Sequence, residues 1–67
     1  MQPVNIGIAQ ISPTRYSIAD DGGASLPDVV GNESPTESRQ MAESAAHLRT
    51  RWYTEQGRAV NPWTVPA

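Results

Sequence analysis

The segment from Ser34 to Gly57 constrains the fold of this 67-residue chain most strongly, because it carries a start signal and a stop signal for a helix. Ser34 and Glu37 have the spacing of a capping box, in which each side chain accepts a hydrogen bond from the backbone of the other residue. Pro35 suits the first helical position, and Gly57 suits a left-handed cap. No Pro or Gly interrupts the residues between them. We therefore predict a helix over about residues 35–56, roughly 33 Å long.

One stripe of this helix carries its most apolar side chains. They recur at intervals of four, three and four, and they are Met41, Ala45, Leu48 and Trp52. This is the spacing of a narrow coiled-coil seam, but two heptads are too few for a stable coiled coil alone. The small side chains of Ala42, Ala45 and Ala46 allow another helix or a sheet to approach closely. The stripe therefore predicts a packed contact along the helix.

The chain has few residues with which to build a core. Leu, Ile and Val together number 11 of 67 residues and Phe is absent, a fraction below the roughly 20% that marks disorder-prone chains. Without Cys there is no disulfide, and a single His provides no metal cluster. A net charge of −2 is low for a disordered chain. We therefore predict little regular structure beyond the helix, in a chain ordered by a partner rather than in an autonomous globular fold.

Residues 1–33 are predicted to form an extended arm with short strands at 3–11 and 15–19, because apolar and polar residues alternate there. The apolar residues that share a strand face are Val4, Ile6 and Ile8, and then Tyr16 and Ile18. The turn signal at 12–14 allows a hairpin, although an isolated hairpin is marginal in water. The strands could equally add to the sheet edge of a partner.

Residues 58–67 are predicted to form an extended tail after the helical segment 34–57. Pro62 and Pro66 exclude a helix and a central strand there. Trp63 is unfavourable to leave in water, and its burial on a partner could contribute roughly 2–3 kcal/mol. The tail therefore predicts a contact with another protein.

Catalytic or metal-binding chemistry has little support in the sequence. His47 lies four residues from Glu43 and from Arg51, but a general base also needs a concave pocket, so a solvated or interface histidine is the favoured interpretation. The acidic turn at residues 20–23 lacks the ligand spacing of a calcium loop. There is no phosphate-binding loop and no Cys nucleophile. We expect no enzyme activity, no metal and no cofactor.

One cluster combines cations with aromatic rings, and it consists of Arg49, Arg51, Trp52, Tyr53 and Arg58. Such a cluster can bind nucleic acid through phosphate pairing and base stacking. The negative net charge and the nearby Glu55 favour instead a helix end with Trp52 in the core. Trp, Tyr and Arg also dominate protein-interface hot spots. We interpret the cluster as a protein contact.

The function favoured by the sequence is that of a non-enzymatic interaction protein, which orders on the larger protein subunits of an assembly. By analogy with other short chains that combine one helix with extended arms, we expect a minor or cementing component of a virus particle, such as a bacteriophage capsid or tail. The alternatives are a small regulator that binds one cellular enzyme and, less favoured, a nucleic-acid-binding protein. The predicted partner-binding residues are Val4, Ile6, Ile8, Tyr16, Ile18, Met41, Leu48, Arg49, Arg51, Trp52, Tyr53 and Trp63.

The sequence also suggests where the protein is located. Residues 1–3 lack the basic segment of a signal peptide, and no apolar run approaches the roughly 20 residues that span a bilayer. We expect synthesis in the cytoplasm, incorporation into a large particle, and no membrane partner.

Overall fold

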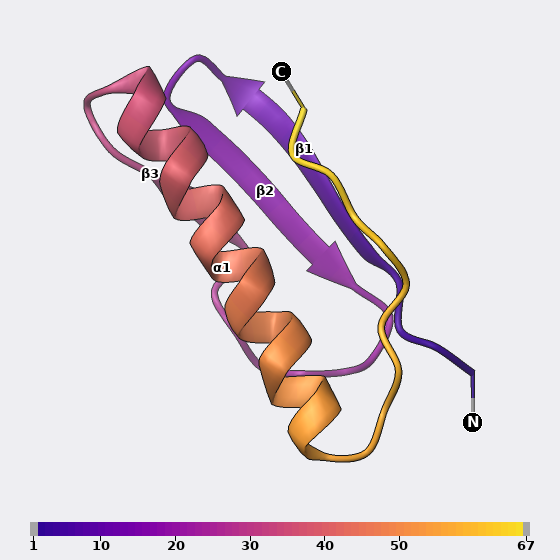
Figure 1. Cartoon of the computed structure of the whole chain (residues 1–67). Coiled ribbons are helices and arrows are strands. Elements are labelled where there is room, and N and C mark those ends of the chain that lie inside the picture. Colours follow the sequence, from indigo (N-terminus) through magenta and orange to yellow (C-terminus); the bar gives the residue numbers. More distant parts are fainter. Residues whose placement is uncertain (1, 67) are drawn as a thin grey trace.

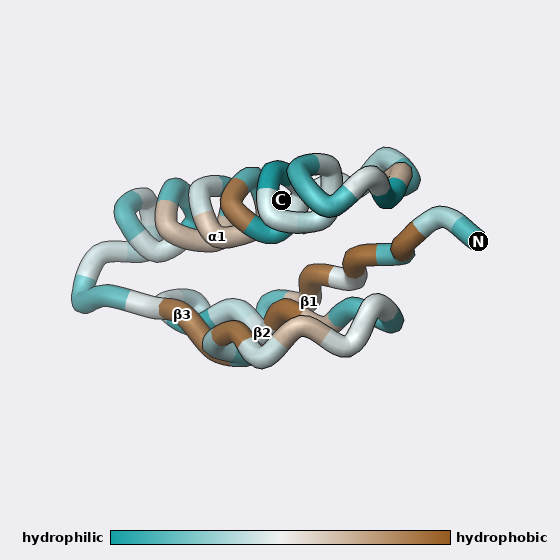
Figure 2. Tube along the Cα trace, turned by 90° about the horizontal axis from the view of Figure 1, so that it is seen from below, coloured by the Kyte–Doolittle hydropathy of each residue, from teal (hydrophilic) through white to brown (hydrophobic). Residues whose placement is uncertain are grey.

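A three-stranded antiparallel sheet packs against one helix in the computed structural model, which describes residues 2–66 (Figure 1). The strands are β1 (Ile6–Ser12), β2 (Arg15–Asp20) and β3 (Val29–Gly31), in the spatial order β1-β2-β3, and α1 (Pro35–Glu55) follows them. Figure 2 shows the sheet in one layer and α1 in the other. The sheet face turned away from α1 is not covered by another element of the described chain.

This fold corrects the expectation of little regular structure that only a partner would order. The three strands pair with one another, and the hydrophobic core joins Val4, Ile6 and Ile18 to Tyr53 of the helix. The apolar residues are few, but they are concentrated on the sheet face that meets α1. A two-layer fold needs only one shared apolar interface. Counting the apolar residues without placing them therefore gave the wrong conclusion.

The register of the hairpin explains which residues reach that interface. Ile8 lies opposite Ile18, and Gln10 lies opposite Tyr16. Opposite residues share a sheet face, as do residues two apart in a strand. Ile6, Tyr16 and Ile18 are accordingly buried, and Ile8 is half-buried. The two predicted strands therefore form a hairpin within the chain, with a register shift between Gln10 and Ser12.

The helix α1 coincides closely with the predicted one because its capping signals operate. The Ser34 side chain accepts a hydrogen bond from the backbone N–H of Glu37 at 3.3 Å, and Pro35 occupies the first turn. At the other end Gly57 has a φ of 79°, which is a left-handed cap conformation. The N–H of Arg58 then bonds back to the Tyr53 carbonyl at 3.0 Å. The chain turns here and reverses its direction.

The C-terminal tail, residues 58–66 of the described chain, first pairs with the segment that precedes β1. The Val4 N–H donates to the Ala59 carbonyl at 2.9 Å, and the Val4 carbonyl accepts from the Asn61 N–H at 2.9 Å. These bonds form a parallel bridge between Val4 and Val60. The tail therefore adds a short fourth segment to the edge of the sheet.

Beyond this bridge the tail runs back along one flank of α1 (Figure 1). The Trp63 indole N–H donates to the Thr50 hydroxyl at 2.9 Å, and the ring packs edge-on against His47 with 4.7 Å between centroids. Arg39 donates to the Val65 carbonyl at 3.2 Å. Trp63, which we expected to contact another protein, thus packs against the helix of its own chain.

Candidate protein-interaction surface

The helix α1 buries a stripe of small and polar side chains. We call it the buried stripe, and it consists of Ser38, Ala42, Ala46, Arg49 and Tyr53. The apolar stripe predicted to be the contact seam lies about a quarter turn away from it at 100° per residue. We keep the name apolar stripe for Met41, Ala45, Leu48 and Trp52. Its three large side chains are 38%, 57% and 42% exposed, respectively.

Small side chains explain why α1 can rest on the sheet with the buried stripe. Ala42 and Ala46 are fully buried, so the helix backbone approaches the strands closely. Ser38 is buried too, and its hydroxyl accepts from the Asn32 N–H at 2.8 Å and donates to the Ser34 carbonyl at 2.8 Å. A buried hydroxyl is tolerated when it is hydrogen-bonded in this way. The polar members of the stripe therefore do not oppose its burial.

The buried stripe also contains a charge, which has a partner in β2. Arg49 is 2% exposed, and its guanidinium donates to the carboxylate of Asp20 and to the Pro27 carbonyl. The Tyr53 hydroxyl donates to the other carboxylate oxygen of Asp20 and accepts from the Ala24 N–H at 3.0 Å. These contacts tie the segment between β2 and β3 to the helix.

The protonation states of this cluster follow from its contacts. Burial alone would raise the pKa of the Asp20 carboxyl. The hydrogen bonds from Tyr53 and Gly22, and then the interaction with Arg49, outweigh burial and hold that pKa below its ordinary value of 3.8. Burial and the bond to Asp20 raise the pKa of the Tyr53 hydroxyl above its ordinary value of 10.0. At neutral pH the cluster therefore holds an ionised Asp20 beside a neutral Tyr53.

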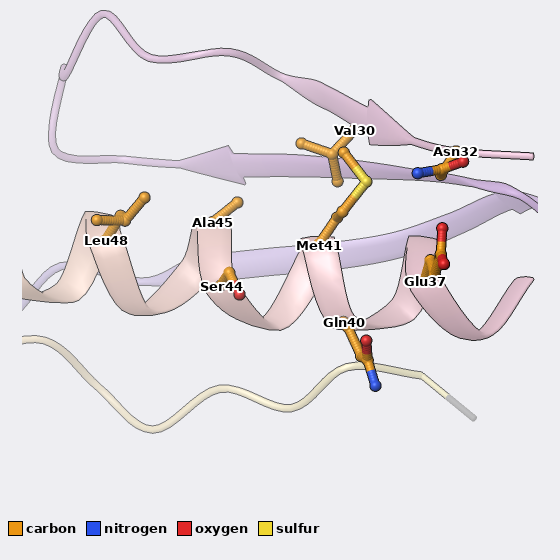
Figure 3. Close-up of a pocket in the computed structure, with 8 residues that line it drawn as sticks. All are labelled: Val30, Asn32, Glu37, Gln40, Met41, Ser44, Ala45 and Leu48. Atoms are coloured by element: carbon orange, nitrogen blue, oxygen red, sulfur yellow. The ribbon is translucent and has the colours of Figure 1, made fainter. Parts of the chain in front are cut away.

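An open groove of about 550 Å³ lies between α1 and β3 (Figure 3). Its lining consists of Val30, Asn32, Glu37, Gln40, Met41, Ser44, Ala45 and Leu48. Met41 reaches toward Val30, and the small Ala45 lies between Met41 and Leu48. A smaller hollow of about 130 Å³ adjoins it and shares Val30, Ala45 and Leu48 with it. Three of the four residues of the apolar stripe thus line one continuous groove.

The structure separates the predicted partner-binding residues into three groups. Six are buried inside the chain, and they are Val4, Ile6, Tyr16, Ile18, Arg49 and Tyr53. Two are half-buried, Ile8 and Trp63. Four are exposed on α1, namely Met41, Leu48, Arg51 and Trp52. Only the side chains of this last group are exposed enough to form the main contacts with another molecule.

The cluster of cations and aromatic rings is not one surface. Arg49 and Tyr53 are buried, whereas Arg51 and Trp52 are exposed. Arg58 lies over the Tyr53 ring, 5.7 Å from its centroid. These side chains therefore point into different environments, and the predicted hot spot is reduced to its exposed members. The arrangement gives no support to a nucleic-acid contact through the whole cluster.

Two features of the surface escaped the sequence analysis. Val30 belongs to β3, a strand of three residues that is too short for a periodic signal. The sequence showed Asp20 only as part of an acidic turn, and its partner Arg49 lies 29 residues further along the chain. The short apolar segment 26–30 was the signal available for β3, and nothing in the sequence pairs Arg49 with Asp20.

Residues 2–66 were compared with the requirements of a metal-binding cluster and of a membrane-spanning helix. Within residues 2–66, no group of three or more His, Asp or Glu side chains could hold a metal ion. No helix there is long and apolar enough to cross a membrane.

Comparison of the chain with protein-family models, with curated proteins and with solved structures finds no match. The inferences about function below therefore rest on the surfaces of the protein itself.

Proposed function

We propose that the protein is a non-enzymatic binding module that receives an amphipathic helix of a protein partner in the groove between α1 and β3. The observation that carries this proposal is the exposure of Met41, Leu48 and Trp52 on the apolar stripe, while the helix buries side chains that are smaller or more polar. Contiguous exposed apolar side chains mark interaction sites on soluble proteins. Met and Trp are also among the residues enriched in protein interfaces.

The shape of the groove favours a helix as its occupant. The apolar stripe runs along α1 for about 16 Å, three helical turns, with the small Ala45 between two long side chains. A second helix laid along it can place one side chain over Ala45 and its neighbours beside Met41 and Leu48. Exposed Glu37 and Arg51 flank the two ends of the stripe. A partner helix is complementary in charge when it places a basic residue beside Glu37 and an acidic residue beside Arg51.

Site-specific photo-crosslinking tests this proposal. A benzophenone side chain replaces Leu48 in the groove or, in the control variant, the exposed Glu43 on another side of α1. In cells that make the protein, we expect a discrete protein adduct from position 48 that is absent from position 43. The purified adduct partner should then lose binding to a Leu48→Glu variant whose circular dichroism is unchanged. Equal adducts from both positions, or none from position 48, would contradict the proposal.

The expectation of a small virus-particle component, in a bacteriophage capsid or tail, stays a prediction within this class of function. The fold changes how such a component would act, because it would dock already folded and would not order on its neighbours. A regulator of one enzyme would use the same groove. The identity of the adduct separates the two, since a repeated assembly subunit supports the first and a single enzyme supports the second.

A further inference from the structure

The strand β1 forms one edge of the sheet, and the peptide groups of its even-numbered residues point away from β2. Two contacts establish this direction. The Asn5 N–H bonds to the Asp21 carboxylate at 2.8 Å, and the Ala9 carbonyl accepts from the Ser17 hydroxyl at 3.5 Å, so odd-numbered residues face β2. Val4 shows the opposite direction, because its peptide groups bond the tail. By alternation, the N–H and C=O groups of Ile6, Ile8 and Gln10 lie on the outer edge.

The tail covers only the first part of this edge. After Asn61 comes Pro62, which has no N–H to donate, and Trp63 then turns toward α1. Among residues 2–66, the outer peptide groups from Ile6 to Gln10 have no backbone partner. An unpaired row of this kind is a template for another strand.

The usual protections against strand pairing are missing from this edge. The strand Ile6–Ser12 contains no charged residue and no Pro, the two devices that most often keep edge strands apart. The register shift lies beyond Gln10 and leaves the segment before it regular. On the opposite edge of the sheet, β3 has only three residues. The unprotected edge is therefore confined to one side of the molecule.

We propose that a second copy of this chain pairs its β1 with this β1 in antiparallel orientation, about a two-fold axis at Ile8. In this register Ile8 lies opposite Ile8 of the second copy, and Ile6 lies opposite its Gln10. Each opposed pair exchanges two hydrogen bonds, because all of these peptide groups point outward. The two sheets join into one six-stranded sheet.

A second copy fits this edge better than an unrelated strand for reasons of charge, size and symmetry. Because β1 carries no charge, pairing it with itself brings no like charges together. The register sets Gly7 opposite Ala9 of the second copy, so small residues meet on the uncovered face. On the other face, the half-buried Ile8 gains its own symmetry mate as a neighbour. The contact uses the same patch on both copies, so it closes at a dimer.

The β1 edge and the groove are independent surfaces. The groove lies beside β3, and β1 is at the other side of β2. A dimer formed through β1 therefore leaves both grooves open to a partner. Loss of one contact does not imply loss of the other.

Sedimentation equilibrium of the full chain over a concentration series tests the dimer. We expect the average mass to rise from 7.3 kDa toward twice that value. The variant Ile8→Pro removes an outward N–H while leaving the bonds from β1 to β2, and it should remain monomeric with its helical circular dichroism retained. A wild-type protein that stays monomeric at every concentration would overturn the proposal.

Cysteine pairing tests the register even if Ile8→Pro fails to fold. The chain has no Cys of its own, so every disulfide that forms must join two introduced cysteines. A mixture of Gly7→Cys and Ala9→Cys should form the mixed disulfide in clear excess over the statistical ratio, because position 7 meets position 9 of the second copy. A side chain fits at Gly7, where nothing lies within 4 Å of an added Cβ. The control mixture pairs Ala9→Cys with Ala19→Cys on β2. Equal behaviour of the two mixtures would refute the register.

Discussion

The two flanks of α1 differ in a way that folding alone does not explain. On the flank toward β1, the tail covers polar side chains, with Trp63 against Thr50 and His47. On the flank toward β3, Met41, Leu48 and Trp52 stay exposed. A helix that served only the fold would cover its most apolar flank first. The exposed flank toward β3 is therefore the side of α1 on which we expect a partner, and stability measurements can test whether that flank supports the fold instead.

The largest contrast is expected between two arginines on these different surfaces. Arg49→Met should destabilise the protein by about 3–5 kcal/mol, because it leaves the buried Asp20 carboxylate without its cation. A domain of this size has only about 5 kcal/mol in total, so the variant should be largely unfolded. Arg51→Met, on an exposed position, should change stability by less than about 0.5 kcal/mol. Urea denaturation followed by circular dichroism measures both, and equal effects would contradict the described burial.

The next contrast concerns side-chain size on the two stripes. Ala46→Leu should destabilise by about 1–3 kcal/mol, because a fully buried alanine has no room for added methylene groups. Leu48→Ala should cost under about 1 kcal/mol, because Leu48 is 57% exposed and already contacts water. The midpoints of urea unfolding compare the two. A larger loss for Leu48→Ala would show that the apolar stripe supports the fold rather than a partner.

A smaller contrast separates the two tryptophans. Trp63→Ala should destabilise the protein by about 1–2 kcal/mol. The Trp63 ring is half-buried, so its removal costs only part of the free energy that a fully buried ring would contribute. The Thr50 hydroxyl also loses the indole donor that bonds to it at 2.9 Å. Trp52→Ala should cost under about 1 kcal/mol, because Trp52 is 42% exposed. Thermal unfolding of the two variants at equal concentration provides the comparison, and the reverse order would place the tail outside the fold.

Local signals in the sequence sufficed for the elements but not for their assembly. The capping residues Ser34 and Gly57 act within a few residues, so the helix could be predicted closely. The alternation around Ile6 and Ile18 likewise predicted two strands. The stripe of α1 that faces the sheet makes contacts between residues distant in the sequence, such as the contact of Arg49 with Asp20. Apolar periodicity therefore predicted the wrong buried stripe.

The candidate surface was predictable only in part, for the same reason. Met41, Leu48 and Trp52 could be selected as binding residues because helical spacing alone aligns them. Their exposure could not be predicted, since it results from the close approach that Ala42 and Ala46 permit. The outward direction of the β1 peptide groups depends on the register of the hairpin. Sequence alone does not specify that register.

The last prediction concerns the dependence of stability on pH. Of the two stripes, only the buried stripe has contacts with shifted pKa values, so pH should affect these contacts and leave the packing of the apolar stripe unchanged. The pKa of Asp20 is lower in the folded protein than its ordinary value, so its contribution to stability is present above about pH 4 and is lost as the pH falls through the folded pKa. The pKa of Tyr53 is raised on folding, so its contribution is present below about pH 10 and is lost as the pH rises further. Urea midpoints should therefore be level from pH 5 to 9 and fall on both sides.

Two variants assign these limbs of the pH profile. Tyr53→Phe removes the hydroxyl that donates to Asp20, so the alkaline decline that it causes should disappear. The acid decline should become smaller, because the pKa of Asp20 in the folded protein then moves up toward its ordinary value. Leu48→Ala changes only the apolar stripe and should keep both limbs. If Leu48→Ala shifted the profile as Tyr53→Phe does, the titrating cluster would not be confined to the buried stripe. A profile that Tyr53→Phe leaves unchanged would mean that other groups set the pH dependence.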